Sequence, residues 1–110
     1  MNKDQRDKID ALITEAKKLK EKLETTNKAL DLYRDDVQGL VDQVDAIKDE
    51  EQEKIDALPE NMANGDKAET MQNAVDTLET AKDALESMRD KLEMDLDDMD
   101  EAIGGLEELI

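Results

Sequence analysis

Residues 9–47 read IDALITEAKKLKEKLETTNKALDLYRDDVQGLVDQVDAI, and this stretch decides the fold class. Apolar side chains recur in it at alternating steps of three and four residues, with one polar interruption at Thr26. The series comprises Ile9, Leu12, Ala16, Leu19, Leu23, Thr26, Leu30, Tyr33, Val37, Leu40, Val44 and Ile47. Such spacing is typical of a long helix with a coiled-coil seam, and a disordered chain does not keep it. We therefore predict one helix over about residues 3–57.

A turn follows this helix. Leu58 precedes Pro59, and the residue before a proline is disfavoured in a helix. The stretch from Pro59 to Gly65 combines proline, asparagine and glycine, the composition of a turn. We predict a turn at residues 58–66.

A second apolar series predicts a second helix over about residues 67–103 or beyond. Asp66 fits its N-cap, with Glu69 completing a capping box, and the pair Gly104-Gly105 fits its end. The series comprises Met71, Ala74, Leu78, Ala81, Leu85, Met88 and Leu92, then slips by four residues to Leu96, Met99, Ile103, Leu106 and Ile110.

Two long helices joined by a short turn favour an antiparallel hairpin, so we predict an all-α fold with one helical-hairpin domain over residues 1–110. Folding back about the turn places Ile47 near Leu78 and Leu40 near Leu85. A three-helix arrangement with a break at Thr25–Asn27 is the alternative, which the unbroken spacing through Thr26 disfavours.

The hairpin register predicts an N-terminal overhang. Ile9, Leu12 and Ile13 would lie in it without an intrachain partner, and they are our candidate oligomerisation residues. An apolar stripe wider than one seam favours more than two helices, so we expect a homodimer forming a four-helix assembly.

Composition argues against an enzyme. The chain has no histidine and no cysteine, which removes the usual metal, thiol and serine–histidine sites. Carboxylate pairs alone can catalyse, but they need an enclosed pocket that a two-helix hairpin does not provide. We expect no cofactor and no metal site.

Charge is the feature that points to function, because 32 acidic residues against 15 basic ones give a net charge of −17. One row of carboxylates follows the outer side of the first helix at heptad and adjoining positions. Like charges placed as helical neighbours cost about 0.2–0.5 kcal/mol per pair. The carboxylate row comprises Asp31, Asp35, Asp42, Asp45, Asp49, Glu53 and Asp56.

Uncompensated carboxylates in a row favour a basic protein surface as the partner. A nucleic-acid-binding protein is the kind we expect, because the row could contact the Lys and Arg side chains that otherwise contact phosphates. The plainer interpretation is a solvated helix face that keeps a coiled coil soluble. We expect no direct binding to nucleic acid, since the half of the hairpin near the turn has no basic patch and the chain has no aromatic platform.

No membrane segment is expected, since apolar runs reach only three residues. A structural alternative is a scaffolding coiled coil that works through its apolar overhang.

The stretch DEEQEKIDALPE at residues 49–60, followed by GDKAETM at 65–71 and AVDTLE at 74–79, resembles small acidic helical-hairpin proteins encoded by phages and prophages of Gram-positive bacteria, a group with no settled function. The resemblance covers residues from about 48 to 103 and is most specific at the Leu-Pro-Glu turn. It implies an accessory phage protein in the cytoplasm of the bacterial host, where inhibitors of nucleic-acid-binding defence proteins are often acidic.

Overall fold

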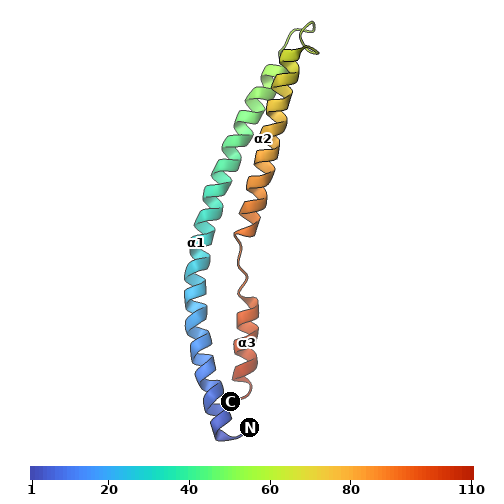
Figure 1. Ribbon diagram of the computed structural model, residues 1–110. Helices are drawn as coiled ribbons and strands as arrows, with labels where there is room; N and C mark the ends of the chain where they lie inside the picture. Colours follow the sequence, from blue (N-terminus) through green and yellow to red (C-terminus); the bar gives the residue numbers. More distant parts are fainter. The chain divides into compact units, whose positions relative to one another are not determined.

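The computed structural model describes all residues from 1 to 110 and contains only helices. They are α1 (Lys3–Asp56), α2 (Asp66–Lys91) and α3 (Asp97–Glu107), in that order along the chain (Figure 1). The first helix runs unbroken through Thr26, which confirms the prediction of one long helix. None of the three helices is long and apolar enough to cross a membrane.

The chain divides into two compact units, and α1 contributes to both. The hairpin unit is Leu32–Leu92, which holds the C-terminal half of α1 and all of α2. The terminal unit joins Met1–Asp31 to Glu93–Ile110 and so holds the N-terminal half of α1 and α3.

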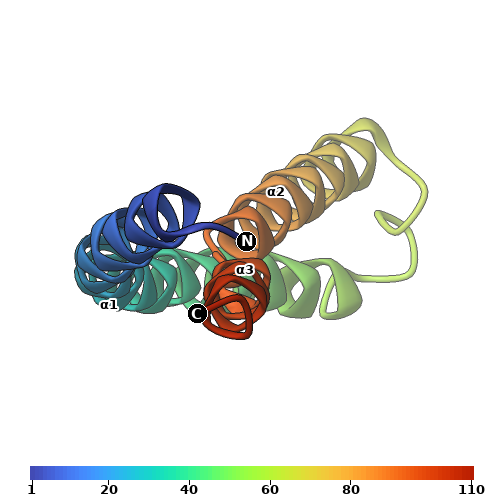
Figure 2. The same cartoon turned by 90° about the horizontal axis from the view of Figure 1, so that it is seen from below.

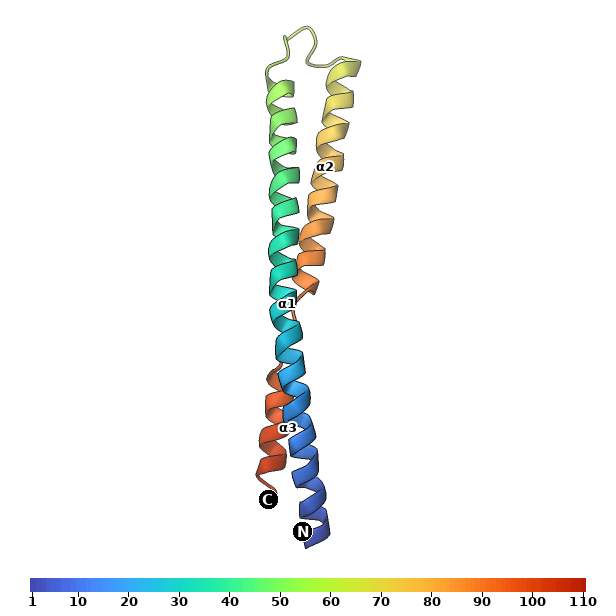
Figure 3. The ribbon, with the colours of Figure 1, turned by 90° about the vertical axis from the view of Figure 1, so that its left-hand side faces the viewer.

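In the hairpin unit α1 and α2 lie side by side and run in opposite directions, as Figures 1 and 3 show. Two contacts between the helices fix the register: Lys48 Nζ lies 2.7 Å from Glu79 Oε2, and Lys82 Nζ lies 3.0 Å from Asp45 Oδ1. Both agree within two residues with the register that paired Ile47 with Leu78. The predicted antiparallel hairpin is therefore confirmed for this unit.

The core of the hairpin unit is thin. Its buried apolar residues are Val37 and Val41 on α1 and Ala68 and Val75 on α2. Val37 belongs to the predicted seam, whereas Val41 lies beside the seam on the helix surface. The line of α1 residues that contacts α2, which we call the contact line, therefore follows one edge of the apolar stripe and not its centre. As a result, the seam positions on the other edge of that stripe remain about half exposed.

The turn after α1 forms where proline and glycine predicted it, and Figure 2 shows it joining the two helices. Two tight backbone bonds shape it, from Met62 N to Pro59 O at 2.8 Å and from Gly65 N to Met62 O at 3.1 Å. Gly65, not Asp66, is the N-cap of α2, and no side chain caps this end. The predicted capping box is thus wrong, because the helix begins one residue earlier and Asp66 is already inside it.

The predicted second helix is also wrong in its extent, because it ends at Lys91 and a new helix begins at Asp97. Local polar contacts stabilise this break. The Arg34 guanidinium donates to the Leu92 carbonyl at 3.1 Å, and Asp95 Oδ1 accepts the backbone N–H of Asp97 at 2.8 Å. Charge favours it too, since basic residues end α2 and three aspartates begin α3, each beside the helix-dipole end of opposite sign.

In the terminal unit α3 lies beside the N-terminal part of α1 (Figure 1). Lys20 forms an ion pair with Asp100, and Lys17 Nζ lies 3.6 Å from Glu107 Oε1. Ile13 is 5% exposed and Ile103 is 6% exposed. The expectation that Ile13 has no intrachain partner is therefore wrong, since a lone helix cannot bury an isoleucine so far.

The contacts of α3 differ from the predicted register. Lys20 forms an ion pair with Asp100, whereas the register that pairs Ile47 with Leu78 would place residue 105 opposite Lys20. Gly104 and Gly105 lie inside α3, so they do not end the helix.

Candidate functional site

The carboxylate row lies on the outer side of α1. Asp35, Asp42, Asp49 and Asp56 follow one another at intervals of seven residues and are all exposed. Asp31, which belongs to the terminal unit, and Glu53 are exposed too. Six of the seven predicted carboxylates are thus exposed, and Asp45, whose side chain is 39% exposed, is partly covered.

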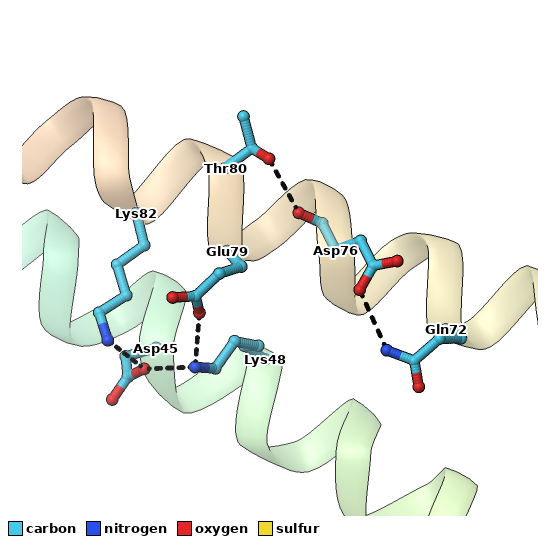
Figure 4. A network of polar contacts seen from close by, with 7 residues as sticks. All are labelled: Asp45, Lys48, Gln72, Asp76, Glu79, Thr80 and Lys82. Carbon is cyan, nitrogen blue, oxygen red and sulfur yellow. Dashed lines mark hydrogen bonds and ion pairs between the residues drawn. The ribbon is translucent and has the colours of Figure 1, made fainter.

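Asp45 is neutralised by two lysines. Its carboxylate lies 3.0 Å from Lys82 Nζ and 3.2 Å from Lys48 Nζ, and Lys48 also binds Glu79 at 2.7 Å, so that a chain of four alternating charges crosses from α1 to α2 (Figure 4). The hydrogen bonds from Lys82 and Lys48 hold the pKa of Asp45 below its ordinary value. Asp45 therefore stabilises the hairpin rather than offering a free charge to a partner.

The same network shifts the pKa values of Lys48, Lys82 and Glu79 in the directions expected for paired charges. The hydrogen bond to Glu79 and then that to Asp45 raise the pKa of Lys48. Asp45 likewise raises the pKa of Lys82, and Lys48 lowers the pKa of Glu79. All four groups are consequently charged at neutral pH.

Two other carboxylates of the row are ordered without being neutralised. The amide of Gln38 donates to Asp42 at 2.9 Å, and the amide of Gln52 donates to Asp56 at 3.1 Å. A glutamine amide carries no net charge, so these bonds orient the carboxylates and leave their negative charge in place. Gln72 and Asp76 repeat the arrangement on α2 (Figure 4).

The row carries less charge per length than nucleic acid. Within the hairpin unit its five exposed carboxylates extend over 21 residues of α1, from Asp35 to Asp56, about 32 Å at about 1.5 Å per residue, or about one charge every 6 Å. A nucleic-acid strand carries about one charge every 3.4 Å. The row therefore has roughly half the line charge of a single strand.

The three candidate oligomerisation residues have different environments. Ile13 is buried, Leu12 is 52% exposed and Ile9 is partly exposed. Only Leu12 therefore offers a large apolar surface, and it is one of a row spaced by seven residues on α1. The exposed apolar members of this row are Leu12, Leu19, Tyr33, Leu40 and Ile47.

The structure also brings together a surface that the sequence prediction did not identify, which we term the uncharged face of the hairpin unit. On α1, Asp45 marks one flank of the contact line, while Leu40 and Ile47 lie on the other. On α2, Glu79 marks the flank that faces Asp45. The uncharged face occupies the opposite flank of both helices and comprises Tyr33, Leu40, Gln43, Ile47, Thr70, Ala74, Thr77, Ala81, Ala84 and Met88, all exposed.

The signal for this face is present in the sequence. The five charged residues of the segment 70–88 all fall at three of the seven heptad positions, on the ion-paired and outer sides of α2. They are Asp76, Glu79, Lys82, Asp83 and Glu86. In a chain of which 43% is charged, so wide an uncharged sector is a distinct feature.

No group of acidic side chains in the structure is arranged to hold a metal ion.

Comparison with known proteins gives a single result. No protein-family model, curated protein or solved structure matches this chain. The resemblance to phage-encoded hairpins therefore stays a prediction.

Proposed function

We propose that the chain is a non-enzymatic interaction protein that binds a basic protein surface through the carboxylate row of α1. The observation that carries this proposal is the contrast within the row. Asp45 forms ion pairs with two lysines, whereas Asp42 and Asp56 accept hydrogen bonds from uncharged amides and keep their charge. An ordered carboxylate costs less conformational entropy on binding than a mobile one.

The geometry of the row supports one class of partner. Carboxylates seven residues apart on a helix recur about every 10.5 Å along one side, as an extended line of anions. A surface that binds a nucleic-acid backbone presents a line of Lys and Arg side chains, with which such carboxylates could pair. We propose a nucleic-acid-binding host protein as the target and a phage-encoded, anti-defence role in the bacterial cytoplasm, which the resemblance of residues 48–103 supports.

We further propose that the chain acts as a homodimer. Leu40 and Ile47 are 48% and 53% exposed in a single copy, although both lie within the apolar stripe of α1. A homodimer would display two carboxylate rows, and simultaneous binding of both to one partner assembly would raise the overall affinity without new contacts.

A competition experiment tests the basic partner. The immobilised chain is incubated with bacterial lysate at low salt, and captured proteins are eluted with rising salt or with added duplex DNA. We expect nucleic-acid-binding proteins that DNA displaces. The variant Asp35→Asn/Asp42→Asn/Asp49→Asn/Asp56→Asn should lose this capture, since it removes four exposed charges from the row.

A matched control separates the row from net charge. Asp7→Asn/Asp10→Asn/Asp83→Asn/Asp98→Asn removes the same number of charges elsewhere and should retain the captured proteins. Equal loss in both variants, or capture that DNA does not displace, would contradict a nucleic-acid-like binding mode.

A further inference from the structure

We infer that a second copy of this chain covers the uncharged face of the hairpin unit, so that two hairpins form a four-helix bundle. This inference specifies the interface of the homodimer proposed above, and it does not depend on the identity of any basic partner. It also moves the interface away from the predicted overhang, because Ile13 is already buried within one chain.

Charge selects a second copy as the occupant. A chain with net charge −17 repels its own copy wherever carboxylates would meet. A basic partner would gain little from a face with so few carboxylates, whereas a second acidic chain is repelled least there. The uncharged face comes nearest to this condition in the hairpin unit: Asp36 and Glu50 border it on α1 at the heptad position of Gln43, and the residues that compose it carry no charge. Its half-exposed large side chains are Tyr33, Leu40, Ile47 and Met88.

The extent of the face suits a dimer. The 26 residues of α2 extend about 39 Å at about 1.5 Å per residue, and two helices of about 10 Å diameter lie side by side. One copy would therefore cover roughly 800 Å² of the other, the area per partner of a stable protein interface. The small side chains Ala74, Ala81 and Ala84 allow the α2 backbone to approach a neighbouring helix closely.

The charged residues at the rim of the face distinguish two orientations of the two-fold axis that relates the two copies. If the two-fold axis lies parallel to the helices, α1 of one copy packs beside α2 of the other. Asp36 then meets Lys91 of the partner subunit, and Gln43 meets Ala84 of the partner subunit. If the axis is perpendicular to the helices instead, two α1 helices meet antiparallel about Gln43, and Asp36 faces Glu50 of the partner subunit. Like charges in contact disfavour the second arrangement, so we assign the first.

Sedimentation of the full chain tests the interface. We expect the wild type to sediment at twice its chain mass of 12.4 kDa. Leu40→Glu should raise the dimer dissociation constant at least about 100-fold, since it brings two carboxylates into an uncharged interface. Circular dichroism of the same samples checks that the helices remain, which we expect because Leu40 is 48% exposed.

The matched control is Leu12→Glu, which places the same charge at an equally exposed leucine in the terminal unit. It should leave the dimer intact. A monomeric wild type up to millimolar concentration, or a dimer that Leu12→Glu dissociates and Leu40→Glu does not, would overturn the assignment. Neither readout involves the basic partner, so failure here and failure of the carboxylate-row experiment are distinguishable.

Crosslinking tests the orientation, because the chain has no cysteine of its own. Copies carrying Gln43→Cys are mixed with copies carrying Ala84→Cys and treated with a short bis-maleimide. The assigned arrangement predicts crosslinks in the mixture and few in either variant alone. Crosslinking between two Gln43→Cys copies would instead show that the α1 helices meet each other, and the assigned orientation would be wrong.

Discussion

Two aspartates one helical turn apart on α1 have opposite environments. Asp45 accepts hydrogen bonds from Lys82 and Lys48, whereas Asp49 is an exposed member of the carboxylate row. Both carry the same charge, and both were predicted as members of one binding row. Their difference depends on where α2 places Lys82, which heptad spacing on α1 cannot reveal.

Substitution of each aspartate should therefore change stability differently. Asp45→Asn leaves Lys48 and Lys82 without a shared carboxylate, and we expect the thermal unfolding midpoint to fall by a few degrees. Asp49→Asn removes repulsion within an acidic helix and should leave the midpoint unchanged or raise it. Circular dichroism melts compare the two variants, and equal destabilisation would show that Asp45 is no more than another surface charge.

The ion-pair network also sets a pH dependence with a defined sign. The pKa values of Asp45 and Glu79 lie below their ordinary values of 3.8 and 4.5, so their contribution is present above pH 4.5 and is lost as the pH falls through the lowered pKa values. The pKa values of Lys48 and Lys82 are raised above 10.5, so their contribution is present below that pH and is lost above it.

Comparison of wild type with Asp45→Asn isolates this effect from the other carboxylates. The difference between their unfolding midpoints should stay constant between about pH 5 and pH 10 and should vanish once acid protonates Asp45 in the folded protein. Melts at a series of pH values measure it. A difference that grows on acidification would contradict the lowered pKa of Asp45.

At the scale of elements, heptad spacing predicts what is periodic and misses what interrupts the period. It predicted α1, the turn and the register of the hairpin unit. It failed at residues 92–96, because the apolar series can be continued through Leu96 by a four-residue slip that looks like a stutter. The decisive information was polar: Arg89 and Lys91 suit a helix end, and Asp95 followed by three more aspartates suits a helix start.

The candidate site was predictable in the same partial way. Exposure of the carboxylate row follows from heptad position, and six of its seven members are exposed. Which half of the apolar stripe α2 covers could not be read from α1 alone, because Val41 and Leu40 are equally apolar. The contact with α2 buries Val41 to 3% exposure and leaves Leu40 at 48%.

The contact that begins α3 gives a prediction at this scale. Asp95→Ala removes the acceptor for the Asp97 N–H and should cost α3 about 0.5–1 kcal/mol, as for the loss of a helix cap. Hydrogen exchange at the amides of α3 should become faster by about 2- to 5-fold, the equivalent of that loss. Asp98→Ala is the control, since it removes a first-turn carboxylate without this hydrogen bond, and an equal effect would mean that charge alone begins the helix.

At the scale of the whole molecule, repulsion among like charges opposes folding. Cations pair with only a minority of the 32 acidic residues, because the chain has 15 basic ones. Salt at about 0.1 M screens exposed charges beyond about 10 Å. Salt also screens the attraction within exposed ion pairs, but such pairs contribute little to the free energy of unfolding.

Added salt should therefore stabilise this protein. We expect the thermal midpoint to rise between about 10 mM and 300 mM sodium chloride, where the screening length shortens from about 30 Å to well below 10 Å. Melts followed by circular dichroism measure it, with sucrose at equal osmolality as the control for solvent effects. A midpoint that falls with salt would mean that the ion pairs outweigh the repulsion.

Tyr33 gives the molecule a spectroscopic reporter of its own. It is the one aromatic residue of the chain, 56% exposed, and it lies on the uncharged face. All near-ultraviolet fluorescence of the protein therefore originates at that surface. A neutral quencher such as acrylamide should reach Tyr33 less easily as the protein concentration rises, and unchanged quenching across a dilution series would mean that this surface stays open to water. Self-association can thus be followed in the unlabelled wild-type chain.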